Sequence, residues 1–95
     1  MSIRRIRRAV RDGRYEVSVH ALDEMDEDDL TDAHVHRVVL RGTLMATLTD
    51  DPRGPRFVVR GTPTETDAEV EVVCRFLPSG RMRIITVYVV KDERL

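Results

Sequence analysis

Apolar residues recur at helical spacing through the N-terminal part of the chain. Ile3, Ile6 and Val10 lie three and four residues apart, and Gly13 follows them. This pattern predicts a helix over roughly residues 2–12. The arginines of the segment lie off the apolar stripe, so the predicted helix is amphipathic.

Two helix N-caps follow, at Ser18 and Thr31. The side-chain oxygen of such a residue accepts a free N–H group from the first turn of a helix. After Ser18 we expect a helix that ends near Asp28, with Leu22 and Met25 as its core anchors. After Thr31 we expect a third helix with an apolar face of valines and a glycine as its C-terminal stop. These residues are Val35, Val38, Val39 and Gly42.

Beyond Gly42 the apolar positions change from a helical period to alternation, which predicts strands. The four predicted strands cover residues 43–49, 56–61, 69–77 and 81–90. Pro78-Ser79-Gly80 predicts a tight antiparallel hairpin between the last two, and the apolar final strand is expected to be central. Tyr15 to Val17 is interpreted as a short extended link. Helices followed by strands predict an α+β fold, with N-terminal helices packed on one face of a four-stranded, mainly antiparallel sheet.

Composition narrows the class of protein. A chain of 95 residues forms one small domain, here 1–95. The lone Cys74 excludes an internal disulfide and a cysteine zinc knuckle, and we expect a reducing, cytoplasmic location. No long apolar run follows the charged N-terminal segment, so neither a signal peptide nor a membrane span is predicted.

Charge is segregated along the chain, although the net charge is −1. Residues 1–14 contain six arginines and one aspartate, whereas residues 23–32 contain seven carboxylates and no base. One interpretation is that the first helix pairs with the acidic second helix. The other is that its arginines bind an external polyanion, either a nucleic-acid backbone or an acidic protein segment.

Candidate chemistry begins after Ser18. His20 and Glu24 lie four residues apart and share one face of the predicted helix. An imidazole exchanges protons near neutral pH, and a carboxylate can orient it or share the task. The alternative is a structural histidine beside a solvent-exposed carboxylate. His34 and His36 point about 200° apart on a helix, so we predict no metal site and no cofactor.

The predicted strands add cations and a phenol. These residues are Arg56, Arg60, Arg75, Arg83 and Tyr88. Guanidinium groups clustered across a sheet hold phosphate by charge-assisted hydrogen bonds, and the tyrosine can stack on a base or donate a proton. The alternative is that Arg56 and Arg60 form cross-strand pairs with Glu71 on an exposed face, and that Tyr88 is half-buried with its hydroxyl at the rim.

Four sequence blocks occur in one order along nearly the whole chain. They are Arg14-Tyr15 with Ser18-x-His20-Ala21-x-x-Glu24-Met25-x-x-Asp28, then Thr31-x-x-x-Val35 with Gly42, then Asp50-Asp51-Pro52-Arg53-Gly54-Pro55-Arg56 with Gly61, and Ile84-Ile85-Thr86-Val87-Tyr88. Together they resemble the family called domain of unknown function 4258 (DUF4258). That family is similar to the RelE- and BrnT-like toxins of type II toxin–antitoxin systems.

The resemblance implies a compact helices-plus-sheet domain and, for the active toxins, metal-independent cleavage of messenger RNA. It also implies a partner, an antitoxin of the MqsA type that carries its own zinc finger. The chain departs from the family pattern at three places. Leu48 stands where an aromatic residue is common, Glu71 where a histidine is common, and Val89 where a proline usually follows Tyr88.

Two functions follow as hypotheses. In the first, the protein is a toxin-like endoribonuclease in which His20 moves protons with Glu24, the strand arginines hold phosphate, and Tyr88 positions a base. In the second, the same fold is a non-catalytic protein-binding module, which the departures at Leu48 and Glu71 favour. A positive cluster beside His20 would support the first function, and a face of satisfied Arg–Glu pairs the second.

Overall fold

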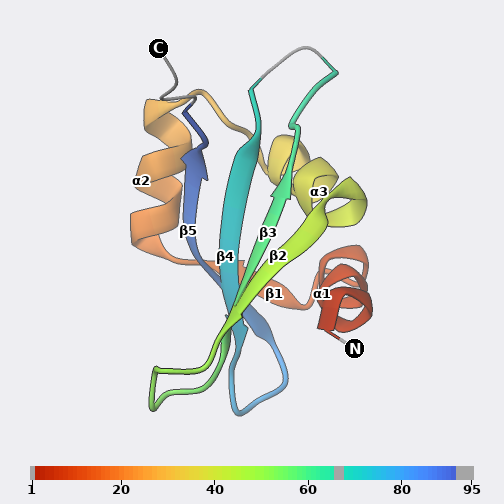
Figure 1. Ribbon diagram of the computed structural model, residues 1–95, viewed down its shortest axis with the longest axis vertical. Coiled ribbons are helices and arrows are strands. Elements are labelled where there is room, and N and C mark those ends of the chain that lie inside the picture. The colour runs from red at the N-terminus through yellow and green to blue at the C-terminus, as the bar shows by residue number, and fades with distance from the viewer. Residues whose placement is uncertain (1, 66–67, 92–95) are drawn as a thin grey trace.

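Within residues 2–65 and 68–91, which the computed structural model describes, the chain forms three helices and one five-stranded sheet (Figure 1). In chain order the elements are α1 (Ser2–Arg11), β1 (Tyr15–Val17), α2 (Val19–Glu27), α3 (Asp32–Arg41), β2 (Thr43–Leu48), β3 (Arg56–Gly61), β4 (Val70–Phe76) and β5 (Met82–Val89). The α+β class is therefore confirmed, as are the three helices and the four strands expected from the pattern.

The strands lie in the order β1-β5-β4-β3-β2. β2, β3, β4 and β5 pair antiparallel with their neighbours in sequence, which confirms the hairpin at residues 78–80. The apolar strand β5 is internal, between β1 and β4, while β4 occupies the centre that we expected for β5. These four strands therefore lie side by side in the same order as in the sequence.

The expected four-stranded sheet is incomplete, because Tyr15–Val17 is a strand and not an extended link. β1 pairs parallel with β5, with Tyr15 opposite Met82 and Val17 opposite Ile84. Three residues are too few to show a clear alternation, and their hydrogen-bond partners lie almost at the other end of the chain. The sheet is consequently mixed, with one short parallel edge.

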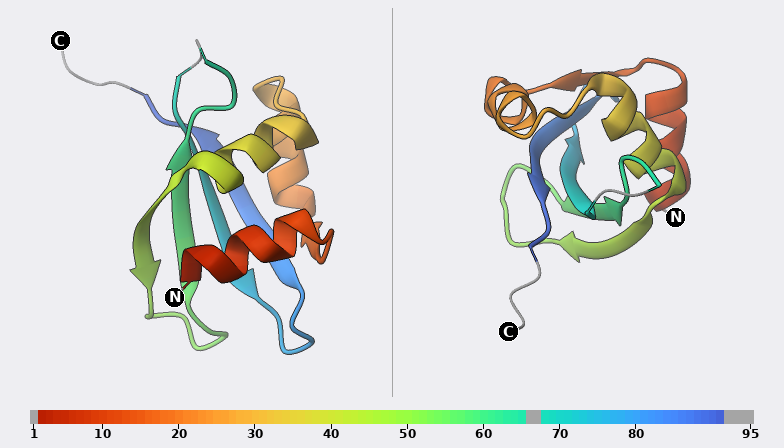
Figure 2. Two further views of the ribbon diagram at one scale, coloured as in Figure 1. Left: turned by 90° about the vertical axis from the view of Figure 1, so that its right-hand side faces the viewer. Right: turned by 90° about the horizontal axis from the view of Figure 1, so that it is seen from above.

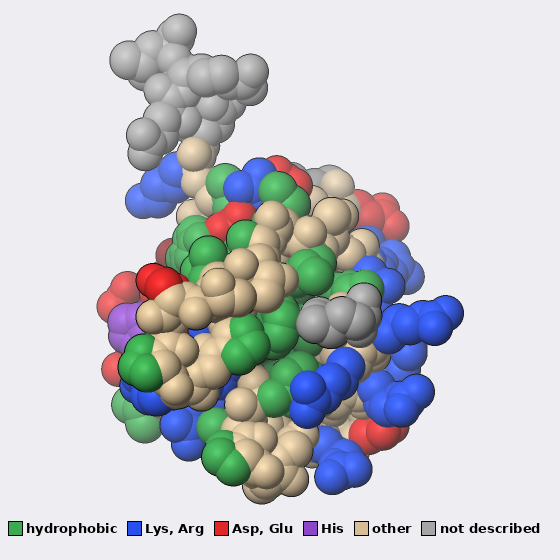
Figure 3. Space-filling model, turned by 60° about the horizontal axis from the view of Figure 1, so that its bottom comes forward, with side chains coloured by type: hydrophobic (Ala, Val, Ile, Leu, Met, Phe, Trp, Pro, Cys, Tyr) green, Lys and Arg blue, Asp and Glu red, His purple; other side chains and the backbone are tan. Residues whose placement is uncertain are grey.

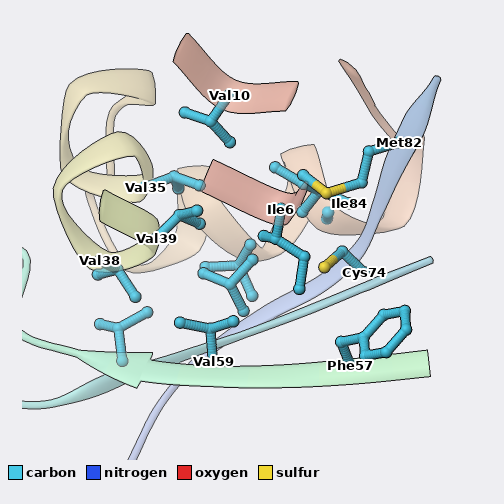
Figure 4. Packing of buried hydrophobic residues seen from close by; sticks show 14 of the residues in the cluster. Ile6, Val10, Val35, Val38, Val39, Phe57, Val59, Cys74, Met82 and Ile84 are labelled. Atoms are coloured by element: carbon cyan, nitrogen blue, oxygen red, sulfur yellow. The ribbon is translucent and has the colours of Figure 1, made fainter. Parts of the chain in front are cut away.

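The helices are not equivalent in their relation to the sheet. Figure 2 shows α1 and α3 across one face, and Figure 1 shows α2 alongside β5 at the edge of the sheet. The core between them is almost entirely aliphatic (Figure 4). Its completely buried members include Ile6, Val38, Val39, Val59, Val72, Met82, Ile84 and Val87.

One predicted core anchor of α2 is wrong. Leu22 is 50% exposed, whereas Ala21 and Met25 are 0% and 5% exposed. Ala21 and Met25 lie four residues apart, so they form one narrow stripe. Because α2 borders the edge of the sheet and does not lie flat on it, this stripe is all that the helix buries.

The helix signals read from the sequence are confirmed. The hydroxyl of Ser18 accepts from the N–H of Ala21 at 3.1 Å, and that of Thr31 accepts from His34 at 3.3 Å. Gly42 caps α3 with φ at −79°, which is not a left-handed conformation. Glycine is required there by close approach instead, because a Cβ would lie 2.3 Å from the carbonyl oxygen of Val38.

Candidate functional site

The polar strand residues lie on the face of the sheet opposite α1 and α3. Side chains alternate between the two faces of a strand, and the other residues of β3 and β4 belong to the core. We call the opposite surface the outer face. Its members on the three inner strands are Arg56, Val58, Arg60, Glu71, Val73, Arg75, Arg83, Thr86 and Tyr88. Neither α1 nor α3 covers this face (Figure 2).

Arg60, Glu71 and Tyr88 form one row across the outer face. They are direct neighbours in the register of β3, β4 and β5. The Nε atom of Arg60 lies 2.8 Å and its Nη2 atom 2.7 Å from Oε2 of Glu71. The hydroxyl of Tyr88 donates to the other carboxylate oxygen. Glu71 is only 7% exposed, so this is a buried carboxylate with a cation on one side and a phenol on the other.

These contacts determine the protonation states of Glu71 and Tyr88. Burial by itself would raise the pKa of Glu71, but the hydrogen bonds from Tyr88 and Arg60 outweigh burial and lower it. The hydrogen bond to Glu71, with burial, raises the pKa of the Tyr88 phenol. Glu71 therefore carries a negative charge at neutral pH, while Tyr88 keeps its proton.

His20 and Glu24 lie on α2 at the border of the outer face. The Nε2 atom of His20 is 3.4 Å from Oε1 of Glu24, and the histidine side chain is 70% exposed. The pairing predicted from their spacing is thus present. The alternative was that His20 is a structural histidine bonded to a backbone group. Among the described residues, no hydrogen bond joins His20 to a backbone group.

Glu24 has a structural task as well. Its Oε1 atom accepts from the hydroxyl of Thr86 at 2.5 Å and from the backbone N–H of Val87 at 2.9 Å. Ser18 adds two bonds to the same strand, from its N–H to the carbonyl of Ile84 and from its hydroxyl to the carbonyl of Ile85, each at 2.9 Å. Ser18 and Glu24 therefore form hydrogen bonds with backbone groups along the edge of β5, where the short strand β1 ends.

The other outer-face arginines also have carboxylate partners. Arg56 lies 3.0 Å from Asp50. Arg75 lies 3.3 Å from Asp51. Arg83 lies 2.8 Å from Glu16. In Asp51, the side-chain and backbone hydrogen bonds from Arg53 lower the pKa far below its usual range. The predicted Arg56–Glu71 pair does not form, because Glu71 faces Arg60 in the register.

The structure thus divides the predicted site residues into two groups. Arg60 and Tyr88 meet at Glu71, and the His20–Glu24 pair borders them through Thr86, which lies two residues from Tyr88 on the same face of β5. Arg56, Arg75 and Arg83 form a second group towards the β4–β5 hairpin. Between the groups lies the row formed by Val58, Val73 and Thr86.

Sequence reasoning missed most of the carboxylates that complete this surface. The cross-strand pair that the sequence predicts between Arg60 and Glu71 is confirmed, but the exposed face predicted for it is wrong at Glu71, which is 7% exposed. A lone carboxylate in the apolar run of β4 is the sequence signal for such a buried, paired group. No role is predicted for Asp51 beyond its place in the third sequence block, yet its side chain is only 11% exposed and contacts Arg53, Arg56 and Arg75. Glu16 had no signal, because β1 was not expected to be a strand.

The two other histidines have local roles. Nδ1 of His34 accepts from the N–H of Thr31 at 3.0 Å, which completes a capping box at the start of α3. His36 is hydrogen-bonded to the hydroxyl of Tyr15, which also contacts Asp32 at 3.1 Å. Burial and Asp32 raise the pKa of Tyr15 to about 12. Within residues 2–65 and 68–91, no three His, Cys, Asp or Glu side chains are grouped as a metal site requires.

The segregated charges do not neutralise each other. Among the described residues, no ion pair joins the arginines of α1 to the acidic side chains of α2. Instead Arg7 donates to the carbonyls of Val39 and Gly42 at 3.3 and 2.8 Å. The predicted pairing of the first helix with the acidic second helix is therefore wrong among the described residues.

Comparison with known proteins locates the chain in a family. No described helix is long and apolar enough to cross a membrane. Neither the curated proteins nor the solved structures contain a match. The family model "Domain of unknown function (DUF4258)" matches residues 17–89, which include α2, α3, the four antiparallel strands and every predicted site residue. The chain therefore belongs to the DUF4258 family.

Proposed function

We propose that the protein is a toxin-like endoribonuclease of the cytoplasm that binds and cleaves RNA on the outer face of its sheet. The observation that carries the proposal is the buried carboxylate of Glu71, which Arg60 and Tyr88 hold on a face that neither α1 nor α3 covers. Buried ionisable groups with shifted pKa values concentrate at functional sites. The resemblance to the RelE- and BrnT-like toxins supplies the reaction class.

Cleavage of RNA by its own 2′-hydroxyl needs a base, an acid and a cation near the phosphate. In the proposed reaction, the 2′-oxygen attacks phosphorus and its proton passes to Glu71. The bond from phosphorus to the 5′-oxygen breaks, and a protonated His20 gives that oxygen a proton. The products are a 2′,3′-cyclic phosphate and a free 5′-hydroxyl.

The remaining residues position these groups. Arg60 stabilises the charge on the phosphate, and Tyr88 positions the nucleotide beside Glu71. Glu24 orients His20, and its Oε1 atom also accepts two bonds from β5, which fix the position of the carboxylate. Arg56, Arg75 and Arg83 bind flanking phosphates by exchanging their carboxylate partners for phosphate oxygens.

The test is incubation of the purified protein with labelled transcripts in the presence of EDTA. We expect cleavage that leaves 2′,3′-cyclic phosphate ends, and we expect Glu71→Gln and His20→Ala to abolish it. Glu69→Gln is the matched control, because Glu69 is exposed and lies two residues from Glu71. Tyr88→Phe is a second probe, since it leaves the Arg60–Glu71 pair in place and lowers the rate without removing the base.

Thermal unfolding of each variant shows that the loss is one of chemistry and not of folding. Growth in cells supplies a second readout, in which expression arrests growth and His20→Ala relieves the arrest. Intact transcripts with the wild-type protein, or equal cleavage by Glu71→Gln, overturn the assignment.

A second function, a non-catalytic protein-binding module, is favoured by one specific observation. All four outer-face arginines are paired with carboxylates, so the face carries little uncompensated positive charge. The partner that the family resemblance implies is an MqsA-type zinc-finger antitoxin. Co-purification of such a protein from a neighbouring gene, together with RNA that stays uncut, would favour the module over the nuclease.

A further inference from the structure

The solvent face of α1 carries arginines that have no acidic partner in the described part of the chain. Arg4, Arg8 and Arg11 lie four and three residues apart, so they share one side of the helix, and all three are exposed. No described carboxylate lies within 4.0 Å of their guanidinium groups. We call these three residues the α1 arginine row. Figure 3 shows Lys and Arg side chains gathered along this side of the molecule.

The row is continuous with other basic surface. Arg4, Arg8 and Arg11, with Arg7, line a hollow of about 330 Å³. Arg8 also lines a second hollow of about 190 Å³, together with Arg5, Asp12, Arg14 and Phe76. The guanidinium carbon of Arg5 lies 3.7 Å from the centre of the Phe76 ring. Asp12 is the acidic group in the lining of this second hollow.

Phe76 connects the helix side of the molecule to the outer face. A third hollow, of about 310 Å³, is lined by Phe76, Arg53, Arg75 and Arg83. The last two are members of the second arginine group of the outer face. Arginine side chains therefore line the hollows on both sides of Phe76, from the second arginine group of the outer face to α1.

The chemistry of the row favours phosphate over a protein partner. The apolar side chains of α1 face inward, since Ile6, Ala9 and Val10 are 0%, 7% and 2% exposed. A protein interface draws its affinity from buried apolar and aromatic anchors, and among the described residues α1 exposes no large apolar side chain. Phosphate recognition needs only guanidinium groups, and arginine suits it by its bidentate geometry.

The spacing also suits a nucleic-acid backbone. At about 1.5 Å of rise per residue, the seven steps from Arg4 to Arg11 span about 10 Å of helix. Phosphates of a stacked strand follow each other at about 3.4 Å along the axis. The row therefore extends over about three consecutive nucleotides.

We infer that the α1 arginine row is a second RNA-binding surface, which holds the backbone of single-stranded RNA outside the cleavage site. The inference rests on the proposed function in taking RNA as the ligand. Its role is affinity for the strand and not chemistry, because the row lies on the helix side of the sheet while Glu71 lies on the outer face.

The experiment measures binding without cleavage. The probe is a short single-stranded oligonucleotide with 2′-O-methyl groups, which lacks the nucleophile, and binding is followed by fluorescence anisotropy between about 50 and 200 mM salt. The test variant is Arg4→Gln/Arg8→Gln/Arg11→Gln. It leaves out Arg7, whose bonds to α3 are structural, and Arg5, which stacks on Phe76.

We expect the triple variant to bind about tenfold or more weakly at about 0.1 M salt and to reduce the slope of log K against log salt by about 2. The variant Arg4→Lys/Arg8→Lys/Arg11→Lys keeps the charge and retains most of the slope. A single pair of variants controls for net charge, because Arg8→Gln weakens binding while Lys91→Gln, which removes a charge at the opposite end of the chain, does not.

The possible outcomes separate this inference from the proposed function. Unchanged binding and slope in the triple glutamine variant overturn the RNA surface, even if transcripts are cleaved. Loss of binding in that variant supports it, even if no transcript is cleaved. Displacement of the oligonucleotide by polyglutamate at equal charge, with the same dependence on the row, assigns the surface to an acidic protein segment and also overturns the inference.

Discussion

Ser18 offers a sharp test of how the His20–Glu24 pair is held against the sheet. Its hydroxyl accepts from the N–H of Ala21 as the N-cap of α2 and donates to the carbonyl of Ile85. Loss of an N-cap costs about 1 kcal/mol, and loss of the second bond, with a part-buried carbonyl left unsatisfied, costs about 1 kcal/mol more. Ser18→Ala is therefore expected to destabilise the protein by about 2 kcal/mol.

Thr31 is the matched control, because it caps α3 and its hydroxyl makes no bond to the described strands. Thr31→Ala is expected to cost about 1 kcal/mol. The two positions also distinguish the hydrogen bond that a capping hydroxyl accepts from the one that the Ser18 hydroxyl donates to the sheet. Asp at either position still caps the helix, but it cannot donate to Ile85, so Thr31→Asp is nearly neutral and Ser18→Asp is destabilising.

The assay is urea unfolding followed by circular dichroism at constant pH, with equal m-values required for all variants. A difference of about 1 kcal/mol between the two alanine variants corresponds to about 4–8 °C in Tm for a domain of this size. Equal losses for Ser18→Ala and Thr31→Ala, or a neutral Ser18→Asp, would refute the reasoning that Ser18 ties α2 to β5.

Two further predictions concern Glu71 and Gly42. Hydrogen bonds lower the pKa of Glu71 in the folded state, so the ionised carboxylate stabilises the protein above the ordinary carboxyl pKa, and this stabilisation disappears as pH falls through the lowered pKa. The difference in unfolding free energy between wild type and Glu71→Gln should therefore shrink below about pH 4. A difference that grows in acid contradicts the lowered pKa. Gly42→Ala places a Cβ 2.3 Å from the Val38 oxygen and 2.4 Å from the Arg60 oxygen, so it should cost about 1–3 kcal/mol or more in urea unfolding. Gly13→Ala meets open space at φ +66° and should cost only about 1–2 kcal/mol, and the reverse order would show that the backbone at Gly42 yields easily.

The three helices and the four antiparallel strands of this fold could be predicted from local sequence patterns. Ser18 and Thr31 cap helices because a cap needs only the next three residues. Val35, Val38 and Val39 are buried as their helical spacing predicted. The alternation from residue 43 onwards marked the four antiparallel strands. Capping and periodicity act over a few residues, so a single sequence displays them directly.

The pairing of charges was decided only by the tertiary structure. Arg83 meets Glu16 across 67 residues, and Arg75 meets Asp51 across 24. Both contacts depend on which strands are neighbours and in what register, and the place of β1 beside β5 was invisible in a three-residue segment. Leu22 is exposed for a similar reason, because the position of α2 at the edge of the sheet decides which of its residues are buried.

The sequence by itself thus determined the helices, the antiparallel strands and the inventory of ionisable side chains. Tertiary structure determined which of those side chains form ion pairs and which lie without an oppositely charged partner among the described residues. The physical reason is that helix and strand formation depends on neighbours along the chain, whereas ion pairing and burial depend on distances in space between residues that the chain separates widely. Glu71 therefore became the centre of the candidate site only after its neighbours Arg60 and Tyr88 were in place.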